Sequence, residues 1–172
     1  LAGKAEKIRD FPVISLETAV AEGLLHFVPE PKSPHGADVT PDGRYIVVGG
    51  KLDTHATVYS FEKIKALIDA KDYAGTDPYG VPILDFQKSI EGQAELGLGP
   101  LHTVFDDHGN AYTSMFVESK IAKWSLKDRK VLAMVGSSSF VECGVNGKLY
   151  AQDDVMVIAG VGVPRECFFA KN

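Results

Sequence analysis

Residues 34–49 read PHGADVTPDGRYIVVG, and residues 100–116 read PLHTVFDDHGNAYTSMF. Each stretch holds a histidine, a short extended segment, a turn ending in glycine and a strand-forming run that contains tyrosine. Gly43 and Gly109 can adopt the positive φ of tight hairpin turns. The runs beside them alternate and are rich in β-branched and aromatic residues, which is typical of half-buried strands. The two stretches therefore predict one strand–turn–strand unit that occurs twice.

Each unit is followed by another alternating strand, at residues 56–61 and 120–126. Repeated units of this kind are how propeller blades appear in a sequence. The repeat distance from His35 to His102 is 67 residues, which exceeds the roughly 40–50 residues of a plain blade. The surplus predicts a short amphipathic helix at about residues 62–70, because apolar residues recur there at helical spacing. Residues 81–86 are expected to form an outer strand, at an edge because Pro82 cannot donate to a ladder.

The predicted fold class is therefore all-β: a partial β-propeller of about two to three blades with a short inserted helix. We expect residues 1–32 to be the end of a preceding blade and a connector, and residues 33–128 to form two blades. Residues 129–172 form a tail that the blade pattern does not assign. A closed ring needs several blades, so we expect an incomplete propeller whose open strand edges favour aggregation or partner recruitment.

Composition narrows the function classes. Hydrophobic residues make up 45% and charged residues 24% of the chain, the balance of a globular protein. A net charge of −5 without a basic block argues against nucleic-acid binding. No stretch approaches the roughly 20 apolar residues of a membrane helix. Cys143 and Cys167 fit neither a CxxC redox pair nor a closed zinc site.

His35 and His102 fall at matching places in the two repeats. Strands that open successive blades line the central channel, so we expect both imidazoles to face one shared space. Imidazole suits copper, zinc, iron and nickel alike, so these residues alone do not select a metal. The alternative is a purely structural role for both. His55 and His108 are expected to be exposed near turns, and His26 to be a half-buried strand residue.

Two longer motifs carry a resemblance to a known family. The first comprises residues 33–36, 40–45 and 49–52, read as SPHG, TPDGRY and GGKL. The second comprises residues 95–103, 105–106 and 109–113, read as ELGLGPLHT, FD and GNAYT. Together, and in this order, they resemble motifs of nitrous oxide reductases over about residues 27–126.

The resemblance implies a seven-bladed propeller followed by a cupredoxin-like domain, in a periplasmic homodimer that takes part in denitrification. In this family a four-copper sulfide cluster, bound by seven histidines, reduces nitrous oxide to dinitrogen and water. In the family, a two-copper centre in the cupredoxin-like domain takes electrons from a donor such as a cytochrome c or a cupredoxin, and the motif of that domain is not found in these 172 residues. By motif match, His35 and His102 are implied as catalytic cluster ligands. The family also binds calcium, but Ser33 stands here where the family has a calcium-binding Asn.

The chain also departs from the family pattern. Residues 131–172 do not resemble the family, and no histidine follows His108. We therefore expect this chain alone to be inactive. Two alternatives remain at this point: a non-catalytic propeller module for binding or structure, and a calcium-dependent propeller hydrolase or lactonase that uses Asp38 and Asn110.

Overall fold

The computed structural model describes residues 2–136. Cys143 and Cys167 lie outside the described residues, as does most of the tail at residues 129–172. The chain divides into two compact units. The larger unit includes residues 30–63 and 90–136, and the smaller unit includes residues 2–29 and 64–89.

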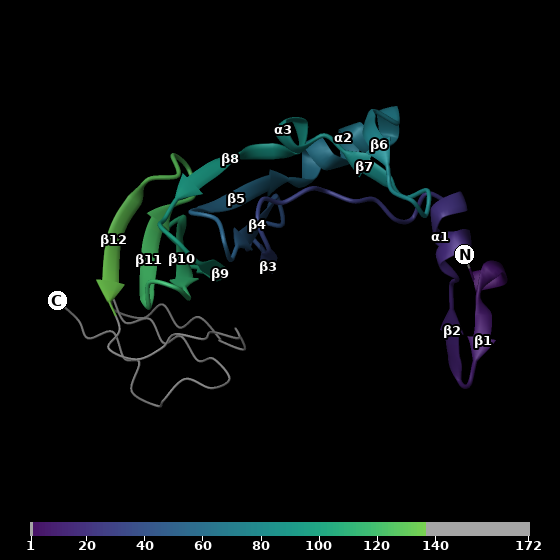
Figure 1. Ribbon diagram of the computed structural model, residues 1–172, viewed down its shortest axis with the longest axis horizontal. Coiled ribbons are helices and arrows are strands. Elements are labelled where there is room, and N and C mark those ends of the chain that lie inside the picture. The colour runs from purple at the N-terminus through teal and green to yellow at the C-terminus, as the bar shows by residue number, and fades with distance from the viewer. Residues whose placement is uncertain (1, 137–172) are drawn as a thin grey trace. The chain divides into compact units, whose positions relative to one another are not determined.

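The larger unit holds two four-stranded antiparallel sheets (Figure 1). The first sheet has the order β3 (Pro34–Val39), β4 (Tyr45–Gly50), β5 (His55–Ser60) and β8 (Ile90–Glu95). The second has the order β9 (Pro100–Phe105), β10 (Asn110–Met115), β11 (Lys120–Ser125) and β12 (Val131–Gly136). Within each sheet, successive strands pair in chain order, as in a propeller blade. The prediction of an all-β, partial propeller is confirmed.

The core lies between the two sheets. Strand β9, which opens the second sheet, packs against β3 and β4 of the first. Alternate positions along the strands point into this interface, because side chains in a strand alternate between two faces. The fully buried Trp124 is the largest side chain here. It lies in a cluster with Val47, Ala56, Val58, Ala94, Leu96, Phe105, Ala111, Met115 and Ala122.

The two predicted hairpin turns are present. Gly43 has φ 70° and Gly109 has φ 81°, in the left-handed region that glycine adopts without strain. In the first turn, Asp42 Oδ1 accepts hydrogen bonds from Thr40 Oγ1 at 2.6 Å and from the backbone N–H of Arg44 at 3.1 Å. These contacts fix the reversal that joins β3 to β4.

The smaller unit consists of short elements. Its strands form two hairpins, β1 (Glu6–Ile8) with β2 (Phe11–Val13), and β6 (Tyr73–Thr76) with β7 (Pro82–Leu84). Its helical elements are η1 (Ala2–Lys4), α1 (Leu16–Ala21) and α3 (Phe86–Ser89). Helix α2 (Phe61–Ala70) begins in the larger unit and ends in the smaller one. It confirms the inserted helix. Among residues 2–136, no helix has the length and apolar character needed to cross a membrane.

A strand forms within residues 81–86, as predicted, but it is not the outer strand of the first blade. Strand β7 pairs with β6 and bridges to Phe27, whereas the fourth strand of the first sheet is β8. Pairing with β5 makes the difference, since β8 forms the ladder with β5 from His55 to Tyr59, while β7 forms its ladder with β6. The insertion therefore lies between the third and fourth strands of one blade.

Candidate functional site

His35 and His102 come together in the larger unit. Their ring centroids are 5.3 Å apart, and the rings meet edge to face at 85°. His35 lies near the start of β3 and His102 near the start of β9. One imidazole thus comes from each blade, as the sequence predicts.

Two glycines of the first blade let its backbone approach the second. A β-carbon on Gly36 would lie 2.4 Å from the carbonyl oxygen of Leu101 and 2.9 Å from Nδ1 of His102. One on Gly49 would lie 2.3 Å from the same Leu101 oxygen. Real side chains do not tolerate such distances, so only glycine permits this packing. The close approach brings the two imidazoles within contact of each other.

Both opening strands carry a bulge at this point. In the first blade, Pro34 pairs with Gly50 and Ala37 pairs with Val48, so β3 has one more residue than β4 between the two pairs. In the second blade, Pro100 pairs with Met115 and Thr103 pairs with Thr113, so β9 has one more residue than β10 between the two pairs. Bulges bend a strand and re-aim its side chains, and they are common beside functional sites.

The pairing registers correct one sequence expectation. When the two bulges are superposed, Pro34 matches Pro100, so Gly36 occupies the place of His102, and His35 the place of Leu101. The two histidines are therefore offset by one residue. This offset puts a glycine in the first blade where the second blade has its imidazole.

Asp38 links the two blades beside this histidine pair. Its Oδ2 accepts a hydrogen bond of 2.7 Å from the backbone N–H of Thr103. Its Oδ1 lies 3.4 Å from Nδ1 of His102. The His102 and Asp38 side chains are 26% and 21% exposed. Sequence reasoning placed Asp38 only in a calcium site, because the bulge that turns it toward His102 leaves no signal in residue spacing.

The loop before β9 explains the glycines of the ELGLGPLHT motif. Gly97 and Gly99 have φ 99° and 97°, which L side chains rarely adopt. A β-carbon on Gly99 would also lie 2.5 Å from the backbone nitrogen of Val117. Glu118 Oε1 accepts a 2.7 Å hydrogen bond from the N–H of Leu98. The first part of the motif, residues 96–99, thus forms a tightly packed loop, called the lead-in loop below, that precedes the strand with His102.

Glu30, which the sequence reasoning did not single out, forms a polar cluster on the first sheet. Its carboxylate accepts hydrogen bonds from Tyr59 Oη and, at 3.0 Å, from Thr57 Oγ1. Gln93 Nε2 donates to the same Thr57 oxygen at 3.1 Å. Burial raises the pKa of Glu30 from 4.5 to about 7, the two hydroxyl hydrogen bonds oppose that shift, and the charge of Asp53 adds to it. Glu30 anchors the connector that leads into β3.

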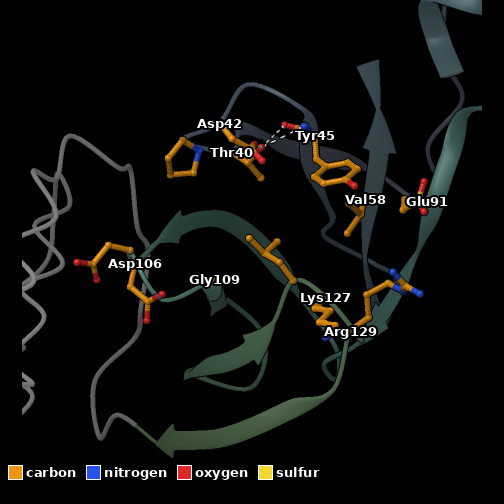
Figure 2. Close-up of a pocket in the computed structure, with 12 residues that line it drawn as sticks. Thr40, Asp42, Tyr45, Val58, Glu91, Asp106, Gly109, Lys127 and Arg129 are labelled. Atoms are coloured by element: carbon orange, nitrogen blue, oxygen red, sulfur yellow. Dashed lines mark hydrogen bonds between the residues drawn. The ribbon is translucent and has the colours of Figure 1, made fainter. Parts of the chain in front are cut away.

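A cavity of about 520 Å³ lies at the opposite end of the same strands. Three turns and the strands beside them line it (Figure 2). The lining residues are Thr40, Pro41, Asp42, Tyr45, Val58, Glu91, Asp106, Asp107, Gly109, Leu126, Lys127 and Arg129. Its acidic side chains are engaged in local structure: Asp106, for example, accepts from the side chains of Asn110 and Tyr112. The histidines lie at the starts of β3 and β9, about 15 Å away at ~3.3 Å per residue. The cavity is therefore separate from the histidine pair.

The other candidates are less suited to metal binding. His108 is 76% exposed beside Asp107, as expected from its turn position. His55 is partly exposed and lies 2.8 Å from Asp53, and His26 is half-buried but lies outside the strands. Over residues 2–136, no group of three or more His, Cys, Asp or Glu side chains is arranged to hold a metal ion. Asp38 and Asn110 contact different partners, which does not favour the calcium-dependent alternative.

Comparison with known proteins gives one consistent result. The chain is 38% identical over 105 residues to the nitrous-oxide reductase of Stutzerimonas stutzeri, a match that covers 61% of the chain. It is 40% identical over 103 residues to that of Cupriavidus necator, which covers 60%. This part of the chain is homologous to a segment of nitrous-oxide reductase.

The matches cover only 15% and 14% of those two enzymes, so the chain spans a small part of the relatives that it matches. No family model matches the chain. Among solved structures, Kuenenia stuttgartiensis hydrazine synthase aligns with a TM-score of 0.44 at 11% identity. That alignment covers 65% of this chain and 26% of the other.

Proposed function

We propose that the chain is a segment of a copper-dependent nitrous oxide reductase, and that His35 and His102 are ligands of its catalytic copper cluster. The observation that carries the proposal is the contact between these two imidazoles, 5.3 Å apart and supplied by two neighbouring blades. The sequence homology to nitrous-oxide reductases supports the same assignment.

The residues present fit part of such a centre. Neutral imidazole nitrogens are good ligands for copper. Two rings whose centroids lie 5.3 Å apart are close enough to bind one metal or two adjacent metals of a cluster. The described residues supply two imidazoles and no third protein ligand. In the proposed centre, further ligands would come from other parts of the whole enzyme.

This chain's own contribution is positioning. The close approach at Gly36 and Gly49 fixes the distance between the two blades. The lead-in loop at Gly97 and Gly99 fixes the start of β9. Such rigidity matters because a metal centre needs ligands that are held in place before the metal binds.

The proposal extends to the whole enzyme. His35 and His102 would hold part of a copper–sulfide cluster, and that cluster would supply the redox chemistry by which nitrous oxide takes up two electrons and two protons to give dinitrogen and water. The full-length protein would be a periplasmic homodimer, in which a two-copper centre would take in the electrons from a donor such as a cytochrome c or a cupredoxin. Calcium is a further possible cofactor of the whole enzyme. The 172-residue chain alone is expected to be inactive.

The test is Cu(I) binding by the full chain under anaerobic conditions, measured by competition with a chromogenic chelator. We expect the wild type to bind Cu(I) and the His35→Ala/His102→Ala variant to lose that binding. His108→Ala is the matched control, because this histidine is exposed and lies away from the pair. Equal Cu(I) binding by the wild type and a folded double variant would overturn the assignment.

A further inference from the structure

We infer that Asp38 is a positioning residue that holds the His102 imidazole in the tautomer with the proton on Nδ1, which leaves the lone pair on Nε2 available to a metal. The inference rests on the proposed function and assigns the atom through which His102 binds. Three observations carry it: the contacts of Asp38, the bulge in β3 and the chemistry of a carboxylate.

The contacts place both oxygens of Asp38 on the strand that carries His102. Oδ2 accepts from the backbone N–H of Thr103 at 2.7 Å, and a backbone donor cannot change its role. Oδ1 then lies against Nδ1 of the adjacent imidazole, at 3.4 Å. The short bond to Thr103 thus orients the carboxylate, and the carboxylate orients the ring.

The bulge makes this contact compatible with the histidine pair. In a regular strand, His35 and Asp38 would point to opposite faces, because they are three residues apart. The extra residue between Pro34 and Ala37 shifts the alternation by one. Consequently His35 and Asp38 both contact the imidazole of His102.

The chemistry sets the tautomer. An ionised carboxylate only accepts hydrogen bonds, so the neutral imidazole bonds to Asp38 only when its proton is on Nδ1. The lone pair is then on Nε2. Metal-binding histidines commonly donate their second ring N–H to a carboxylate, which fixes the ring and raises its basicity.

The test reads the tautomer directly by long-range ¹H–¹⁵N correlation on the metal-free, ¹⁵N-labelled full chain. His102 is assigned by comparison with His102→Ala. We expect Nδ1 to show the shift of a protonated nitrogen and Nε2 that of an unprotonated one. A wild-type His102 with its proton on Nε2 would overturn the inference.

Asp38→Asn gives the sharper contrast. The single amide oxygen is expected to stay on the Thr103 N–H, which turns the amide NH₂ toward Nδ1. This donor favours the opposite tautomer, with the proton on Nε2. Asp69→Asn is the matched control, because Asp69 is an exposed residue of α2 that pairs with Lys65.

Cu(I) affinity supplies the second measurement. We expect Asp38→Asn to bind Cu(I) about 10–100-fold more weakly than wild type, while Asp69→Asn is unchanged. A folded Asp38→Asn chain with the wild-type tautomer and affinity would overturn the inference. Failure of this inference can be told apart from failure of the proposed function. If the proposed function is wrong, His35 and His102 do not bind Cu(I), whereas the tautomer of His102 is measured on the metal-free chain.

Discussion

Gly36 and His102 lie so close that a β-carbon on the glycine would stand 2.9 Å from Nδ1 of the imidazole. They occupy the same place in the two bulged strands, β3 and β9. At this position β3 has a glycine, without a side chain, and β9 has a histidine. The contact between His35 and His102 depends on this difference.

Gly36→Ala tests that dependence. The added methyl group has to displace the backbone of Leu101 as well as the His102 ring, so the blades must separate. Overpacking of this kind destabilises proteins by about 1–3 kcal/mol. We expect a loss of that size in urea unfolding, together with weaker Cu(I) binding.

Gly75→Ala is the control for Gly36→Ala. Gly75 lies in β6, and a β-carbon there would meet nothing within 4 Å. We expect its unfolding free energy to change little and its Cu(I) affinity not to change. If Gly36→Ala is as stable as Gly75→Ala, the two blades do not pack as closely at Gly36 and His102 as described.

Gly99→Ala tests the lead-in loop against a matched turn. Gly43 and Gly99 both have positive φ, but only Gly99 has a neighbouring backbone within 4 Å of its β-carbon position. Gly43→Ala should therefore cost only the backbone term, about 1–2 kcal/mol. Gly99→Ala should cost about 1–3 kcal/mol more, because Val117 must also move. Equal losses in denaturant unfolding would show that the loop is not tightly packed.

Thr113→Val probes the buried polar contacts of the second blade. Thr113 Oγ1 accepts from Trp124 Nε1 at 2.9 Å and bonds to Thr103 Oγ1 at 2.8 Å. Valine keeps the shape but leaves the buried indole N–H without this acceptor, which costs about 1–3 kcal/mol. Unfolding can be followed by fluorescence, since Trp124 is the only tryptophan in the chain.

Thr113→Ser is the companion variant. It retains the hydroxyl and removes one methyl group, so we expect a smaller loss of about 1 kcal/mol. A serine variant that is less stable than the valine variant would contradict the role assigned to the hydrogen bonds.

The sequence predicts local geometry well and long-range register poorly. The turns at Gly43 and Gly109 and the inserted helix follow from residue type and spacing alone. The fourth strand of the first blade was misplaced, because residues 81–86 and 90–95 both suit a strand and only the ladder with β5 decides between them.

The same distinction applies at the candidate site. The pairing of His35 with His102 was predicted from the repeat. Their one-residue offset and the contact of Asp38 with His102 were not, because both depend on bulges that are defined only by the pairing with β4 and β10. Glu30 was missed for a related reason, since its partners Thr57 and Tyr59 lie 27 and 29 residues away.

Glu30→Gln tests the pH dependence of the cluster that anchors the connector. The folded-state pKa of Glu30 is about 7, raised from 4.5 mainly by burial. Below about pH 4.5 the carboxyl is neutral in both states, so burying it costs no charge and its contribution to stability is fully present. Between about pH 4.5 and 7 the folded chain keeps a proton that the unfolded chain has released. As the pH rises from about 4.5 to 7 that contribution is lost, because the buried carboxyl becomes charged in the folded state. Glutamine stays neutral, so residue 30 should cause no loss of stability in the Glu30→Gln variant between pH 4.5 and 7.

The measurement is urea unfolding of wild type and Glu30→Gln from pH 4.5 to 8.5. We expect the variant to gain stability relative to wild type as the pH rises from about 4.5 to 7 and the difference to level off above 7, since Thr57 and Tyr59 can turn their hydroxyls to suit an amide. Glu95→Gln is the control, because Glu95 is exposed at the end of β8, and its curve should run parallel to that of the wild type. A Glu30→Gln curve that also runs parallel to wild type would show that Glu30 titrates as an ordinary surface carboxylate. In that case burial by the first sheet does not hold its proton.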